Sequence, residues 1–146
     1  VPKGNPNNWQ SLQDLATAQQ WVIGSESVPA GAYAREVLRR AEADFGAEWR
    51  TAVDARIGSH EPNVRWVRTK VALGEADAGF VYASDVTPSV NVSILPLSPT
   101  HRVQTDLVMG LASPGDSPAT RDWLGFWMSA AGQDLLVHHG FQRVTP

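Results

Sequence analysis

Two predicted helix starts lack the acidic residues that helices commonly carry in their first turn. Residues 28–34 read Val-Pro-Ala-Gly-Ala-Tyr-Ala, and Asn63 precedes Val64 and Arg65. The first N–H groups of a helix have no partner within the helix and lie at its positive end, so they attract anions. The N–H groups of Ala30 and Val64 are therefore candidate anion donors. An ordinary pair of strand–helix units would carry the same pattern.

A third candidate group follows another predicted strand. Tyr82 comes at the end of an apolar run, and Asp85 follows it closely. A phenol at the carboxyl end of a strand is an uncharged donor that can reach a ligand. Asp85 could act as a base or a metal ligand, but a lone Asp after a strand more often closes a turn or caps a helix. We expect a ligand role for Tyr82 and a structural role for Asp85.

The histidines form no predicted catalytic or metal constellation. His138 and His139 are adjacent on a predicted helix, so their side chains point about 100° apart and do not easily share one ion. His60 and His101 fall in predicted loops without an acid at a diagnostic spacing. Nucleophile, phosphate-loop and dinucleotide fingerprints are missing from the sequence. We therefore expect no enzyme, no catalytic residue, no metal ligand and no cofactor.

The composition is that of a single globular domain. The chain has 146 residues, of which 42% are hydrophobic and 18% charged. Its net charge of −3 argues against non-specific nucleic-acid binding. It contains no cysteine, which excludes disulfides and thiolate metal sites, and no apolar run of about eighteen residues that could span a membrane. No signal peptide is visible and the chain opens without methionine, so we expect a processed or trimmed N-terminus. Six tryptophans indicate either an aromatic core or faces that rest on a partner.

Hydrophobic spacing predicts helices that alternate with strands, which is typical of an α/β layered fold. Pro29 suits the first position of a long helix, and Glu36 and Arg40 stand at the favourable i, i+4 spacing within it. Asn63 and Gly74 are a natural start and stop for another helix. The predicted helices are 11–16, 29–45, 47–53, 64–73, 117–130 and 130–139, and the predicted strands are 21–24, 55–58, 78–82, 90–95 and 105–111.

Several blocks, taken in order, carry a family likeness. They are residues 28–34, 63–65, 74–85, and 131–133 with 140–141, together with the opening segments 1–6 and 11–16. This ordered set resembles the molybdate- and tungstate-binding proteins of ABC importers, which have the type II periplasmic binding protein fold. The likeness covers nearly the whole chain.

The resemblance implies an α/β fold of the type II lobe, with a mixed sheet flanked by helices and C-terminal helices beyond it. Residues 1–104 would form the second, ligand-binding lobe with an entry crossing strand. Residues 105–146 would supply a return strand and helices that pack on a first lobe, which is missing upstream of Val1. The stripe of Trp123, Phe126 and Trp127 would then be exposed or covered by a partner.

The resemblance also implies a function. The chain would bind molybdate or tungstate through neutral donors, namely the N–H groups of Ala30 and Val64 and the hydroxyl of Tyr82, in a half-site form. It would be the solute-binding component of a bacterial ABC importer, periplasmic or on the cell surface. Its partners would be the oxyanion, the transporter permease and the missing first lobe or its equivalent, with no nucleic acid and with the membrane reached only through the transporter or a lost anchor. The alternative is a ligand-sensing or partner-binding module that reuses the fold, as a regulatory domain or a split binding protein.

Overall fold

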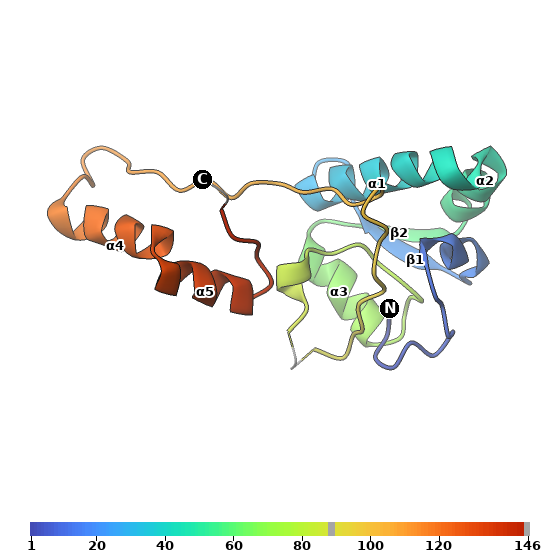
Figure 1. Cartoon of the computed structure of the whole chain (residues 1–146). Helices are drawn as coiled ribbons and strands as arrows, with labels where there is room; N and C mark the ends of the chain where they lie inside the picture. The colour runs from blue at the N-terminus through green and yellow to red at the C-terminus, as the bar shows by residue number, and fades with distance from the viewer. Residues whose placement is uncertain (88–89, 145–146) are drawn as a thin grey trace. The chain divides into compact units, whose positions relative to one another are not determined.

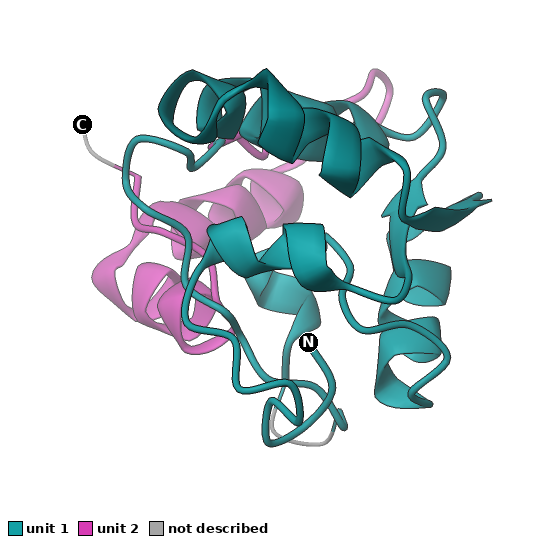
Figure 2. Cartoon of the chain, turned by 90° about the vertical axis from the view of Figure 1, so that its right-hand side faces the viewer, with its two compact units in different colours: residues 1–103 teal, residues 104–146 magenta. Residues whose placement is uncertain are grey.

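The computed structural model describes residues 1–87 and 90–144. In chain order its elements are η1 (Leu12–Thr17), β1 (Trp21–Gly24), α1 (Pro29–Phe45), α2 (Ala47–Asp54), β2 (Ile57–Glu61), α3 (Val64–Ala72), η2 (Ala83–Asp85), α4 (Pro118–Met128) and α5 (Ala130–His138), as Figure 1 shows. The chain divides into two compact units, Val1–Val103 and Gln104–Pro146 (Figure 2). Which lobe of a binding protein each unit represents stays a prediction, and the last two residues of the second unit lie outside the described ranges. None of the described helices is long and apolar enough to cross a membrane.

The first unit is built on a parallel pair of strands. β1 and β2 run parallel, and Val22 also forms a parallel bridge with Gly79, so β1 lies between β2 and the segment that leads to Tyr82. The Val22 N–H donates to the carbonyl oxygen of Ala78 at 3.0 Å. A bridge between Pro2 and Val92 adds antiparallel pairing to the first unit.

Helices cover both faces of this small sheet. Trp21 and Ile23 of β1 belong to a core cluster with Val37, Leu38 and other residues of α1. Val22, the residue between them, packs instead with Val67 and Val71 of α3. Because successive strand residues face opposite sides of a sheet, α1 and α3 lie on opposite faces. The predicted α/β fold is confirmed.

Three of the six tryptophans account for much of the main core. Trp9, Trp21 and Trp49 are each less than a tenth exposed. The indole N–H of Trp21 donates to the carbonyl oxygen of Val53 at 2.8 Å, and that of Trp49 to Gln13 at 2.9 Å. Burial is therefore achieved without leaving either donor unpaired, since a buried polar group needs a partner.

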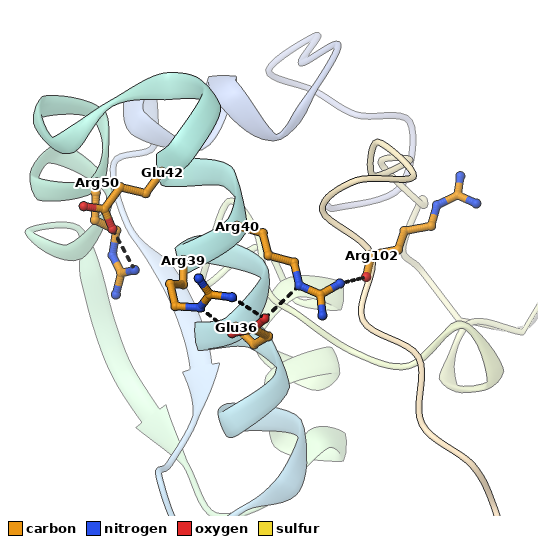
Figure 3. Close-up of polar contacts among 6 residues, drawn as sticks. All are labelled: Glu36, Arg39, Arg40, Glu42, Arg50 and Arg102. Atoms are coloured by element: carbon orange, nitrogen blue, oxygen red, sulfur yellow. Dashed lines mark hydrogen bonds and ion pairs between the residues drawn. The ribbon is translucent and has the colours of Figure 1, made fainter.

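The predicted helices are confirmed, some with shifted ends. Pro29 opens α1 as expected. Glu36 accepts from Arg40 at 2.8 Å and also from Arg39 at 2.7 Å, and hydrogen bonds from both guanidinium groups lower the pKa of Glu36 to about 2. Arg40 donates in addition to the carbonyl oxygen of Arg102 at 2.5 Å (Figure 3). The exposed side of α1 thus holds the segment that ends the first unit.

Most of the predicted strands are wrong or displaced. The strand expected at 55–58 lies at Ile57–Glu61, and the one expected at 78–82 is reduced to the bridge at Gly79. The entry crossing strand and the strand expected at 90–95 pair only briefly, in the bridge between Pro2 and Val92 and in neighbouring hydrogen bonds such as that from the Ser93 N–H to the Val1 carbonyl oxygen at 2.9 Å. Residues 105–111 form no strand, and Val108 is 92% exposed. An apolar run becomes a strand only where a neighbouring strand continues the pairing, and apart from β2 these runs have at most an isolated bridge among the described residues.

The second unit is a pair of consecutive helices. Ser117 and Ser129 cap α4 and α5 by accepting from the N–H groups of Thr120 and Gly132. At the end of α5, Gly140 takes a positive φ of 85° and the Phe141 N–H donates to the Leu136 carbonyl oxygen, which closes the helix with a left-handed glycine cap. Only Gly132 and Gln133 are buried in the two helices, whereas Trp123 and Phe126 are 55% and 44% exposed.

Candidate oxyanion site

The carboxyl ends of three parallel segments meet at one edge of the sheet. β1 ends at Gly24, β2 ends at Glu61, and the segment after Gly79 runs beside β1 toward Tyr82. The Ser25 N–H donates to the carbonyl oxygen of Glu61 at 2.8 Å, which ties the two strand–helix loops together. Ligands of open α/β sheets bind at such an edge.

The start of α1 approaches the end of β1 closely. A Cβ on Gly31 would overlap the carbonyl oxygens of Gly24 and Ser25, so glycine is required there. Val28 provides no side-chain cap, and its carbonyl oxygen accepts from the N–H groups of Gly31 and Ala32. Within the described residues the N–H of Ala30 has no acceptor. This N–H therefore stays a candidate anion donor, as the sequence predicts.

The start of α3 has a side-chain cap but no acid. The Asn63 side-chain oxygen accepts from the Trp66 N–H at 3.2 Å, which confirms the predicted cap. The first turn contains no Asp or Glu, and the Val64 N–H has no acceptor in the described part of the chain. Two successive βα units therefore present helix starts without acids at one edge of the sheet.

Tyr82 lies where the third segment ends in the short turn η2. The Tyr82 N–H donates to the Asp85 carboxylate at 3.2 Å, and the Asp85 N–H donates to the Tyr82 carbonyl oxygen at 3.0 Å. This confirms the structural role expected for Asp85. The Tyr82 ring meets the Tyr33 ring of α1 edge to face, with centroids 6.3 Å apart. Burial, and then the charges of Tyr33 and Asp85, raise the pKa of the Tyr82 phenol above its usual value, so it stays a proton donor at neutral pH.

The structure thus brings the three predicted positions to the same edge. Ala30 and Val64 begin helices that follow neighbouring strands, and Tyr82 touches α1 through Tyr33. Their role as ligand donors stays a prediction.

Charged groups near this edge were not singled out from the sequence. Glu61, at the end of β2, is 6% exposed, and its carboxylate accepts from Lys70 of α3 at 2.6 Å and from Ser59 at 2.5 Å. Burial by itself would raise the pKa of Glu61, but the hydrogen bonds from Lys70 and Ser59 outweigh it and hold the pKa below its usual value. Arg35 donates to the carbonyl oxygens of Gly24 and Gly31 at 3.2 and 3.0 Å. The contacts of Lys70 with Glu61 and of Arg35 with Gly24 join different elements, so no local spacing in the sequence predicts them.

One of the histidine predictions needs correction. His60 belongs to β2 and not to a loop. His101 lies in a turn as expected, and its Nε2 lies 2.7 Å from the Asp44 carboxylate, which is 57 residues away in the sequence and so at no diagnostic spacing. His138 and His139 stack edge to face at the end of α5. The described residues contain no group of three side chains suited to hold a metal ion.

Parallel strands with helices on both faces, and helix starts gathered at their carboxyl edge, define an α/β fold of the kind that binds ligands at that edge. Residues 1–142 match the family described as bacterial extracellular solute-binding proteins, and the chain belongs to this family. That family consists of binding proteins and not of enzymes.

The relatives are longer than this chain. The molybdate-binding protein ModA of Mycobacterium tuberculosis is 28% identical over 143 residues, which is 96% of this chain and 51% of ModA. A Bacillus subtilis protein named as an ABC transporter substrate-binding lipoprotein, YvgL, is 34% identical over 96 residues, or 65% of this chain and 34% of YvgL. The matched segments therefore cover about half of ModA and about a third of YvgL.

Two solved structures share the fold. The substrate-binding domain of a molybdenum ABC transporter from Clostridium difficile superposes with a TM-score of 0.68 at 23% identity, covering 98% of this chain and 62% of that one. PEB3, solved with L-phospholactate, superposes with a TM-score of 0.79 at 17% identity, covering 99% and 63%. Both likenesses support a periplasmic-binding-protein-like fold.

Proposed function

We propose that this chain binds a tetrahedral oxyanion, molybdate or tungstate, as part of the solute-binding component of a bacterial ABC importer. The observation that carries the proposal is the meeting of two helix starts without acids and one neutral phenol at a single sheet edge. The similarity to ModA over 96% of the chain supports the choice of anion.

Neutral donors are sufficient for this chemistry. The N–H groups of Ala30 and Val64 add the positive ends of two helix dipoles, and the Tyr82 hydroxyl adds a donor that its raised pKa keeps protonated. Preorganised dipoles in a site that excludes water replace the hydration shell of the anion. The contacts above place two carboxylates near this edge: Lys70 compensates the charge of Glu61, and the Asp85 carboxylate accepts from the Tyr82 N–H.

The proposed site is one half of a two-lobed cleft. The chain spans 51% of ModA, so the remaining donors would come from a first lobe or its equivalent. The exposed aromatic residues of α4, Trp123 and Phe126, are the proposed surface for that lobe. The working location would be outside the cytoplasmic membrane, with a transporter permease as partner.

Calorimetric titration with molybdate, tungstate, sulfate and L-phospholactate tests the proposal. The chain itself and the complete product of its gene should both be titrated, because half of a site binds more weakly than a whole one. We expect heat with molybdate and tungstate, tighter binding by the complete product, and weaker binding of sulfate. No binding of either metal oxyanion by the complete product would refute the proposal. Preferential binding of L-phospholactate would instead identify the ligand as a phosphorylated carboxylate and not a metal oxyanion.

A further inference from the structure

One side chain of α3 holds the turn that carries Tyr82. Arg68 Nη1 donates to the carbonyl oxygen of Asp85 at 2.9 Å. Arg68 is half-buried and projects from the helix whose first residue is Val64. This hydrogen bond therefore links α3 to the end of the Tyr82 segment.

The turn transmits this contact to Tyr82. Asp85 accepts from the Tyr82 N–H through its carboxylate and donates its own N–H to the Tyr82 carbonyl oxygen, at 3.2 and 3.0 Å. Both peptide groups that flank the Tyr82 Cα are thereby fixed relative to Asp85. Because the direction of a side chain follows from its backbone, the orientation of the Tyr82 ring depends on where Asp85 is held.

We propose that Arg68 is a positioning residue for Tyr82, which it aims by anchoring the turn at Asp85. The consequence for binding rests on the proposed function, because Tyr82 is there an anion donor. The Val64 N–H belongs to α3, and Arg68 of the same helix holds the turn of Tyr82. Arg68 would therefore set the distance between the Val64 N–H and the Tyr82 hydroxyl. The guanidinium itself is bound to a backbone carbonyl and need not touch the ligand.

Arg56 offers a matched control. Its guanidinium also donates to backbone carbonyls, those of Ala18 and Ala52 at 2.9 and 2.8 Å. It precedes β2, and so lies at the opposite end of that strand from the proposed site. Arg56→Met removes the same kind of contact and should leave Tyr82 untouched.

The first test needs no ligand. Tyr33 and Tyr82 are the only tyrosines, so the ring signals of Tyr82 in an NMR spectrum are assigned with Tyr33→Phe. In Arg68→Met we expect these signals to move toward those of an exposed tyrosine and the pKa of Tyr82 to fall toward its ordinary value. Loss of the Arg68 charge alone would raise that pKa, so the sign separates positioning from electrostatics.

The outcomes of this test are distinct. Arg68→Lys, which can donate to the same carbonyl, should bring the Tyr82 signals part of the way back to their wild-type positions. Arg56→Met should not move them. Unchanged Tyr82 signals in a folded Arg68 variant, or a raised pKa, would overturn the proposal. If Arg68→Met does not fold, Arg68→Gln provides the same comparison.

The second test is a double-mutant cycle with molybdate as the probe. Arg68→Met should weaken molybdate binding about tenfold in the wild-type background and less than threefold in Tyr82→Phe. The losses should not add, because both changes act on the same donor, the Tyr82 hydroxyl. Equal losses in both backgrounds would refute action through Tyr82. If the wild-type protein binds no oxyanion, the proposed function fails while the NMR comparison still decides the role of Arg68.

Discussion

Glu61 places a negative charge at the edge of the sheet where an anion is proposed to bind. The carboxylate is nearly buried, and Lys70 and Ser59 both donate to one of its oxygens. The Lys70 side chain is partly exposed, so water solvates part of its ammonium charge while its hydrogen bond to Glu61 is kept. The pair therefore does two things: it joins α3 to β2, and it cancels a charge that would repel the ligand.

Removal of Lys70 should be costly. Lys70→Met leaves Glu61 buried without its cation, and we expect the free energy of unfolding to fall by about 2 kcal/mol. Urea unfolding measures this change. The double variant Glu61→Gln with Lys70→Met should recover most of the loss, and Arg39→Met, which removes an exposed partner of Glu36, should change little. Equal stability of the Lys70 variant and the wild type would contradict the pairing.

The same carboxylate predicts a pH dependence. The folded pKa of Glu61 lies below its ordinary value of 4.5, so the stability that it contributes is present above pH 4.5 and is lost as the pH falls through the folded pKa. The free energy of unfolding should therefore decline on acidification below that pH, and decline less steeply in Glu61→Gln. Parallel curves for the two proteins would show that Glu61 does not titrate differently in the folded state.

Tyr82 gives the most direct test of the site at this scale. Tyr82→Phe removes one donor to a charged ligand, so molybdate binding should weaken at least tenfold, or about 1.5–3 kcal/mol. Calorimetry measures the change, and unfolding in urea should show that the fold is retained. Tyr33→Phe, which keeps the ring against Tyr82, is the matched control and should weaken binding less. The reverse order would assign the donor to Tyr33.

At the scale of elements, the start of α3 must both end the loop and face the ligand. Asn63 caps the helix through its side-chain oxygen, and aspartate caps a helix equally well. Asn63→Asp should therefore keep the stability of the helix and add a negative charge beside the Val64 N–H. We expect unchanged unfolding and strongly weakened oxyanion binding.

The cap of α4 supplies the control for this change. Ser117→Asp introduces the same charge at a helix start for which no ligand is proposed. Binding should be unaffected there. If Asn63→Asp bound molybdate as tightly as the wild type, the start of α3 would not belong to the site.

The helices were predictable because their signals are local. Pro29, Asn63, Ser117 and Gly140 stand where the structure starts or ends a helix, and a cap acts within one turn of its own residue. Strands depend on distant partners. The run at 105–111 has the composition of a strand but joins no sheet among the described residues, and the segment at 78–82 meets β1 in a single isolated bridge.

At the scale of the whole molecule, the two compact units differ in how they are stabilised. Both clusters of buried apolar residues lie in Val1–Val103, whereas α4 and α5 bury only Gly132 and Gln133. A truncated chain of residues 1–103 should therefore fold by itself and keep most of its free energy of unfolding. Circular dichroism and urea unfolding of the truncated and complete chains measure this directly.

The separate segment 104–146 is the complement of that experiment. With Trp123 and Phe126 exposed, it should show little helix alone and a red-shifted tryptophan emission. A cooperatively folded 104–146 segment, or an unfolded 1–103, would reverse this assignment of stability.

The sequence by itself determined the helices, their caps, the α/β class and the positions of the candidate donors, because each depends on residues within a few places of one another. Only the tertiary structure decided that Ala30, Val64 and Tyr82 share an edge, that Lys70 neutralises Glu61, and that Arg68 holds the turn of Tyr82. Those relations depend on parallel pairing around β1 and on contacts between separate elements. Such contacts follow from which surfaces pack together, and no short stretch of sequence records that choice.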